Sequence, residues 1–217
     1  MEATKQVGGD FFDFFLIDSN KLGFVICDVS GKGVPSSIFM AVARTLIHSF
    51  GIAGYSTAEC LKLTNKILCD HSVDSMFVTV FYGILDITTG EVTYTNAGHN
   101  YPFIVSGLGV IQALTQGSSI ILGIFEDAEF ILNTIKLEPN TSILLYTDGV
   151  TESMDEFNNQ LGEEALSRHI KKLTTIGFDR PNPKFIVNSV FDLVKQHARN
   201  SSKQSDDITV LCITYYG

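Results

Sequence analysis

The spacing of hydrophobic positions predicts a chain of grouped strands with helices between the groups. Strands are indicated where β-branched and aromatic residues gather, at Phe14–Ile17, Leu22–Cys27, Phe77–Leu85, Glu91–Thr95, Phe103–Val105, Phe130–Leu137, Ser142–Tyr146 and Ile208–Tyr215. Helical spacing covers Pro35–Phe50, Thr57–Ser72, Gly162–Leu173 and Pro183–Arg199. Short turns between grouped strands are typical of an α+β sandwich and not of alternating βαβ units. Several strands are apolar on both faces, which predicts sheets packed between other layers.

Local signals support individual elements. Pro35 stands where a helix favours its first residue, and Asp86–Gly90 has the composition of a hairpin turn between two strands. The aromatic run Phe11–Phe15 is interpreted as core rather than as a binding surface. With 217 residues the chain is long enough for one sizeable domain, and we expect a single domain over residues 1–217.

Charge narrows the classes of function. The net charge of −9 argues against a nucleic-acid partner, because no basic stripe is present to neutralise backbone phosphates. An acidic chain also repels phosphate substrates unless a bound cation reverses the local field. Any phosphate chemistry here would therefore need a metal.

The cysteines and the apolar runs predict a cytoplasmic protein. The cysteines are scattered without a zinc-type spacing, so they are expected to be reduced thiols. No apolar run has the ~18 residues of a membrane span, since Arg44 interrupts the best candidate, and direct membrane contact is not expected. The N-terminus lacks the apolar segment of a secretory signal.

A glycine-rich stretch, Asp28-Val29-Ser30-Gly31-Lys32-Gly33, invites comparison with a nucleotide-binding P-loop. That motif needs a glycine five positions before its Gly-Lys and a serine or threonine after it. Here Ile26 and Gly33 occupy those positions, so a P-loop nucleotide hydrolase is rejected. The stretch is better explained as a tight turn from a strand into a helix.

Acidic residues recur at the ends of apolar strands: Asp10, Asp28, Asp148 and the pair Asp206-Asp207. Each taken alone is equally consistent with a solvated turn. Together they form a set of hard oxygen ligands, and no cysteine or histidine has the spacing of a zinc site, which selects Mg²⁺ or Mn²⁺. Two such ions can activate water and clamp a phosphoryl group.

A second unusual stretch is Asn96-Ala-Gly-His99-Asn100, a turn between strands. His99 either caps backbone groups of the loop or takes part in catalysis, and the residues alone leave both interpretations open.

The motifs in their order resemble the bacterial SpoIIE-type phosphatases, a branch of the metal-dependent (type 2C) protein serine/threonine phosphatases. The resemblance spans nearly the whole chain and rests on Val7-Gly-Gly-Asp10-Phe-Phe-Asp13-Phe-Phe, Asp28-Val-Ser-Gly-Lys-Gly33, Phe77-Val-Thr-Val-Phe-Tyr-Gly83, Asn96-Ala-Gly-His-Asn100, Tyr146-Thr-Asp-Gly-Val-Thr-Glu152 and Asp206-Asp-Ile-Thr209.

The resemblance implies a four-layer α-β-β-α sandwich with two Mn²⁺ or Mg²⁺ ions. Asp28 would bridge both metals and Val29 would bind through its backbone carbonyl, while Asp148 and Asp206 hold the second metal and Asp10 lies close by. Metal-activated water would hydrolyse phosphoserine or phosphothreonine. The implied substrate is an anti-anti-sigma-like (STAS) phosphoprotein in bacterial signal transduction.

Two positions depart from the wider family. Ser30 stands where eukaryotic relatives have a histidine that protonates the leaving group, and no arginine precedes Asp10 to grip phosphate. His99 is therefore our candidate for the general acid. The resemblance also predicts an upstream sensory or receiver domain in a longer protein, and it is compatible with a homodimer. The alternative is a catalytically weak phosphoprotein-binding regulatory domain of the same fold.

Overall fold

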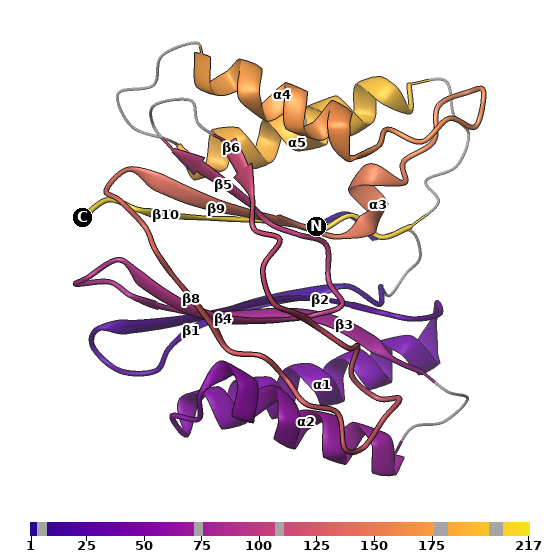
Figure 1. Cartoon of the computed structure of the whole chain (residues 1–217). Helices are drawn as coiled ribbons and strands as arrows, with labels where there is room; N and C mark the ends of the chain where they lie inside the picture. Colours follow the sequence, from indigo (N-terminus) through magenta and orange to yellow (C-terminus); the bar gives the residue numbers. More distant parts are fainter. Residues whose placement is uncertain (4–7, 72–75, 107–110, 176–181, 200–205) are drawn as a thin grey trace. The chain divides into compact units, whose positions relative to one another are not determined.

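A computed structural model describes residues 1–3, 8–71, 76–106, 111–175, 182–199 and 206–217 (Figure 1). The chain divides into two compact units. Unit 1 comprises Met1–Thr4, Asn100–Leu114 and Leu137–Gly217, and unit 2 comprises Lys5–His99 and Thr115–Lys136. Each unit has its own sheet and its own helices.

Unit 2 contains a six-stranded sheet covered on one face by two helices (Figure 1). Its strands run in the order β1-β2-β3-β4-β7, with β8 also paired to β4, and all pairs are antiparallel except β4–β7. The elements are β1 (Phe11–Leu16), β2 (Lys21–Val29), α1 (Val34–Ile52), α2 (Thr57–His71), β3 (Val78–Asp86), β4 (Glu91–Ala97), β7 (Ser118–Ser119) and β8 (Asn133–Lys136).

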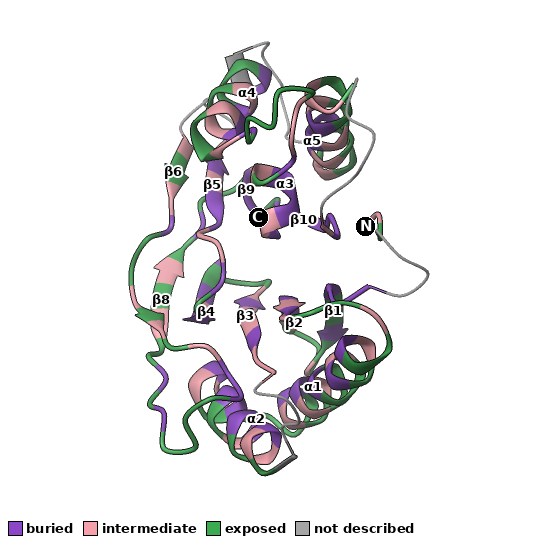
Figure 2. Cartoon of the chain, turned by 90° about the vertical axis from the view of Figure 1, so that its right-hand side faces the viewer, coloured by how far each residue is buried: buried purple, intermediate pink, exposed green. Residues whose placement is uncertain are grey.

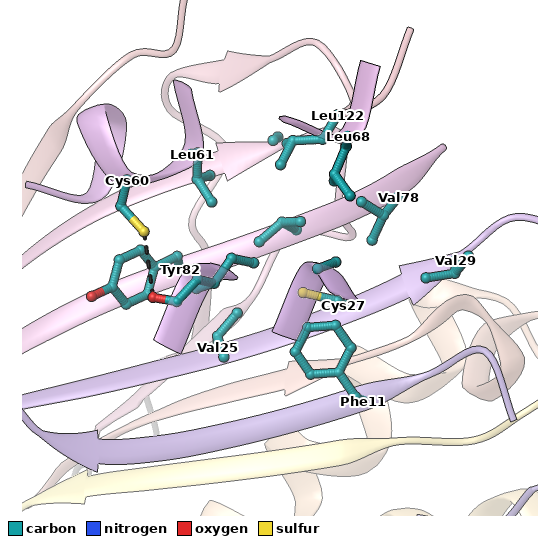
Figure 3. Packing of buried hydrophobic residues seen from close by; sticks show 14 of the residues in the cluster. Phe11, Val25, Cys27, Val29, Cys60, Leu61, Leu68, Val78, Tyr82 and Leu122 are labelled. Carbon is teal, nitrogen blue, oxygen red and sulfur yellow. Dashed lines mark hydrogen bonds between the residues drawn. The ribbon is translucent and has the colours of Figure 1, made fainter. Parts of the chain in front are cut away.

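Strand alternation divides the side chains of unit 2 between the two faces of its sheet. On β2, Val25, Cys27 and Val29 join the hydrophobic cluster with the helices, which also contains Cys60 and Tyr82 (Figure 3). Phe24 and Ile26, which alternate with these residues along β2, are fully buried as well. The middle of β2 is therefore buried on both faces, as its uniformly apolar sequence predicted.

The start of α1 follows from three local features. Gly33 adopts a positive φ of 95°, and a proline occupies the first turn of the helix. The hydroxyls of Ser36 and Ser37 both donate to the Gly33 carbonyl oxygen, each at 2.9 Å. This turn fixes the position of α1 directly after the stretch that contains Asp28.

Unit 1 contains a four-stranded antiparallel sheet in the order β10-β9-β5-β6. Its elements are β5 (Phe103–Ser106), β6 (Ile111–Ala113), β9 (Thr141–Tyr146), α3 (Asp148–Thr151), α4 (Glu163–Thr175), α5 (Pro183–His197) and β10 (Val210–Tyr215). Helices α4 and α5 bury one side and expose the other (Figure 2), and their apolar residues pack with the sheet in one cluster. No helix within the described residues is both long and apolar enough to cross a membrane.

The predicted α+β class is confirmed: the chain has two mainly antiparallel sheets, each with its own layer of helices. Every predicted strand and helix is present, most of them with at least one end shifted, and the Asp86–Gly90 hairpin is confirmed. The predicted end of the second helix at Ser72 lies outside the described residues. The short elements β6, β7 and α3 were not predicted. The assignment of the whole Phe11–Phe15 run to the core is wrong, because alternation along β1 leaves Phe12 and Phe14 37% and 61% exposed.

Candidate active site

Asp10 and Asp28 are neighbours at one end of the unit 2 sheet. Phe11 pairs with Cys27 across β1 and β2, so the residue before Phe11 lies beside the residue after Cys27. Asp10 is only 2% exposed, and Asp28 is half-buried. Burial raises the pKa of the Cys27 thiol well above its usual value, and the negative charges of Asp10 and then Asp28 raise that pKa further. Both carboxylates therefore act on the same buried position.

The glycines before Asp10 allow a close approach to Val29. A Cβ atom added to Gly9 would lie 2.9 Å from the Val29 carbonyl oxygen, a contact that side chains do not make. The Ser37 hydroxyl on α1 also reaches this loop and contacts the Gly8 carbonyl oxygen at 3.2 Å. The first turn of α1, the Val29 carbonyl and the loop that carries Asp10 thus form one connected arrangement.

Asp148 and the Asp206-Asp207 pair come together in unit 1. Asp148 begins α3 directly after β9, and the next residue, Gly149, lies so close to the Asp207 carbonyl oxygen that any Cβ there would overlap it. Two hydrogen bonds between Thr147 and Thr209 hold the start of α3 against the segment that carries Asp206 and Asp207. The Thr147 backbone N–H donates to Thr209 O, and the Thr147 hydroxyl accepts from Thr209 N–H, each at 3.0 Å. Asp206 is partly exposed, and its carboxylate accepts from the Asp207 N–H at 2.9 Å.

His99 belongs to unit 2 and is 4% exposed. Asn96 holds the backbone of His99 from both sides: its carboxamide oxygen accepts from the His99 N–H at 2.8 Å and its amide donates to the His99 carbonyl at 3.0 Å. The ring Nδ1 lies 2.9 Å from the hydroxyl oxygen of Thr79. Thr79 is the residue opposite Asp28 in the β2–β3 register. Sequence reasoning missed Thr79, whose only signal is a polar side chain inside an apolar strand.

The donor set fits a divalent cation. Asp10 and Asp28 place two carboxylates side by side, one of them almost fully buried, and such a pair is costly without a positive charge nearby. Their oxygens and the Val29 carbonyl are hard ligands of the kind that Mg²⁺ and Mn²⁺ prefer. Among the described residues no group of three or more His, Cys, Asp or Glu side chains could hold a metal ion. Each unit brings together a pair of the predicted ligands.

Comparison with known proteins identifies a family model and several relatives that match this chain. Residues 18–216 match the family model of stage II sporulation protein E (SpoIIE). The chain is 28% identical to protein IcfG of Synechocystis sp., over 98% of this chain and 36% of that protein. It is 30% identical to the phosphoserine phosphatase RsbU of Bacillus subtilis, over 70% of this chain and 45% of that protein. The chain thus spans less than half the length of these relatives.

Solved structures show the same fold. The PP2C phosphatase domain of SpoIIE from Bacillus subtilis superposes with a TM-score of 0.81 at 19% identity, covering 97% of this chain and 60% of that one. RsbX in complex with magnesium superposes with a TM-score of 0.68 at 16% identity, covering 98% of this chain and 90% of that one. The family model, which matches almost the whole chain, and the PP2C fold lead to one conclusion: the chain belongs to the SpoIIE family.

Proposed function

We propose that this chain is a metal-dependent phosphoprotein phosphatase that hydrolyses phosphoserine or phosphothreonine. The observation that carries the proposal is the adjacent pair Asp10 and Asp28, with Asp10 only 2% exposed at the end of a buried sheet. The kinship with RsbU, a phosphoserine phosphatase, supports the choice of substrate. We propose a phosphorylated protein of the anti-anti-sigma (STAS) type as the partner, which the family resemblance implies.

We further propose the residues that hold the metal. In unit 2 these are the carboxylates of Asp10 and Asp28 with the Val29 carbonyl, and in unit 1 the carboxylates of Asp148 and Asp206, for two Mn²⁺ or Mg²⁺ ions. Bound divalent metal would lower the pKa of water to a physiological range and neutralise phosphoryl charge. It would also resolve the conflict between a net charge of −9 and an anionic substrate.

The chain's own residues orient these groups. Ser30 holds residues 28–32, the end of β2 and the turn after it (called the Asp28 loop), against Phe77, the residue before β3. The backbone N–H of Ser30 donates to Phe77 O, and its hydroxyl accepts from Phe77 N–H, each at 2.9 Å. Both bonds hold the loop in one position, so the Asp28 carboxylate needs little reorganisation when a ligand arrives. We propose His99 as the general acid that gives a proton to the departing serine or threonine oxygen.

The test compares Asp28→Asn with Asp70→Asn, an exposed position of the same unit with the same change of charge. Turnover of a phosphoserine peptide is measured after chelation and after Mn²⁺ is returned. We expect chelation to abolish turnover, Mn²⁺ to restore it, and Asp28→Asn to lose at least ~100-fold, the upper end for losing a ligand's supporting partners. Asp70→Asn should behave as the parent.

Two outcomes contradict the proposal. Full turnover by Asp28→Asn would remove Asp28 from the metal site. A chain that binds the phosphopeptide without Mn²⁺-dependent turnover would instead favour the catalytically weak binding domain.

A further inference from the structure

The hydrogen bond between Thr79 and His99 links the Asn96–Asn100 loop to the strand beside Asp28. On β3, Val78 and Val80 belong to the hydrophobic cluster with the helices, so Thr79 points to the opposite face of the sheet. On β2, Cys27 and Val29 belong to the same cluster, so Asp28 shares the face of Thr79. Directly paired residues on one face have Cβ atoms about 5 Å apart. Thr79 therefore lies between Asp28 on one side and His99 on the other.

The two halves of His99 are held by different residues. Asn96 fixes the backbone through its two hydrogen bonds, neither of which involves the ring. The bond from Nδ1 to Thr79 Oγ1, 2.9 Å long, fixes the orientation of the ring. A threonine on a central strand is itself rigid, because its branched side chain has few rotamers.

If His99 acts as an acid, its Nδ1–H must be the donor in the hydrogen bond with Thr79. A histidine that acts as acid starts with protons on both ring nitrogens and gives the Nε2 proton to the leaving oxygen as its bond to phosphorus breaks. It then retains a proton on Nδ1, which needs an acceptor throughout the reaction. The Thr79 hydroxyl oxygen is in the position to accept it.

We propose that Thr79 is a positioning residue, which accepts a hydrogen bond from Nδ1–H of His99 and thereby makes Nε2 the nitrogen that exchanges protons with substrate. This inference rests on the proposed phosphatase function. Its first consequence, the protonation pattern of the ring, belongs to the metal-free protein and can be measured without turnover.

The first measurement is side-chain ¹⁵N NMR of His99 in the metal-free chain at a pH where the ring is neutral, with His99→Ala identifying the signals. We expect the parent and Thr79→Ser to carry the proton on Nδ1, and Thr79→Val to move it to Nε2. The matched control is Thr95→Val on β4 of the same sheet. It also removes a buried threonine hydroxyl, one that makes a 2.9 Å hydrogen bond to the Thr57 hydroxyl on α2. That variant should leave the His99 signals unchanged. Parent-like His99 signals in Thr79→Val overturn the proposal.

The second measurement compares a phosphoserine peptide with an aryl phosphate, whose leaving group needs little protonation. Thr79→Val should slow the phosphoserine peptide by about 10-fold, as for other supporting residues, and the aryl phosphate much less. His99→Ala should show the same selectivity with a larger loss, and Thr79→Ser should restore the parent rate. Equal losses on both substrates in Thr79→Val overturn the proposal. An inactive parent chain refutes the proposed function instead, and the NMR result still decides whether Thr79 controls the ring.

Discussion

Asp206 and Asp207 are adjacent in the sequence but differ in their surroundings. Asp207 is 5% exposed, and its carbonyl oxygen packs against Gly149 next to Asp148. Asp206 is partly exposed, and its carboxylate accepts the Asp207 N–H. In the wider type 2C phosphatase family that the sequence resembles, an aspartate is followed by an asparagine at these positions. The resemblance implies that the first position needs the charge and that the second needs only the shape and hydrogen bonding of that side chain.

We therefore predict that Asp206→Asn loses metal-dependent turnover while Asp207→Asn retains a substantial part of it. The two variants change the charge equally and so control for one another. Turnover at saturating Mn²⁺ is compared after circular dichroism shows that both are folded. The reverse order of loss would mean that the metal ligand is Asp207 and that the motif is aligned one residue out of register.

At the level of residues, the sequence predicts which side chains could bind metal better than it predicts which side chains form ion pairs with one another. The recurrence of acids at strand ends singled out Asp10 and Asp28, and the register of β1 with β2 makes them neighbours. The partners of Asp13 were not predictable: its carboxylate contacts His48 Nδ1 at 2.9 Å and Arg44 Nε at 3.2 Å, from a helix about 30 positions further along the chain. Such pairs depend on how α1 lies over β1, which local composition does not encode.

Among the elements, α1 is positioned by the backbone of Gly33. Its φ of 95° and ψ of −155° lie in a region that only glycine adopts without strain. A larger residue at position 33 would strain the backbone where the Asp28 loop joins α1. Gly54, after the end of α1, offers a comparison, because it has a φ of 86° and likewise has open space around it.

We predict that Gly33→Ala and Gly54→Ala both lower the free energy of unfolding by about 1–3 kcal/mol, the cost of a strained backbone. Only Gly33→Ala should also reduce Mn²⁺-dependent turnover, since only Gly33 connects α1 to the Asp28 loop. Denaturant unfolding and turnover are measured on the same preparations. Equal turnover of the two variants would show that the junction does not control the site.

Very short helices and strands cannot be predicted from the sequence, because they contain too few residues to show a hydrophobic period. β7 has two residues and α3 has four, about one period of a strand and of a helix, whereas a reliable pattern needs several periods. Each nevertheless matters to a site residue. α3 begins at Asp148, and β7 runs beside Asn96 and Ala97 at the end of β4. Both elements depend on contacts with segments distant in the chain, which only the folded structure provides.

On the scale of the whole molecule, the chain passes between its units more than once. Unit 2 is completed by Thr115–Lys136, which follows the first strands of unit 1. Grouped strands predicted the α+β class correctly, but hydrophobic patterns do not show which strands share a sheet. We expected a single domain, and the structure has two compact units, each with its own hydrophobic core. The expectation of a single domain stays a prediction.

The whole chain is expected to bind divalent metal weakly. Each unit presents only a pair of the proposed carboxylates, so water must supply many of the remaining ligands, and we expect a dissociation constant near ~1 mM, the weak end for oxygen-ligand sites. At about 10 mM Mn²⁺ such binding stabilises the folded state by about 1.4 kcal/mol. For a chain of this length that raises the melting temperature by roughly 3–6 °C.

Thermal unfolding with and without Mn²⁺ measures this shift, with sodium chloride of equal ionic strength as the reference for screening of the −9 net charge. Asp70→Asn should keep the shift and Asp28→Asn should lose it, although both variants carry the same net charge. An equal shift in the two variants would assign the stabilisation to screening or to another site. A shift that saturates at micromolar Mn²⁺ would contradict the weak affinity, because it would require a site whose ligands come mainly from the protein and not from water.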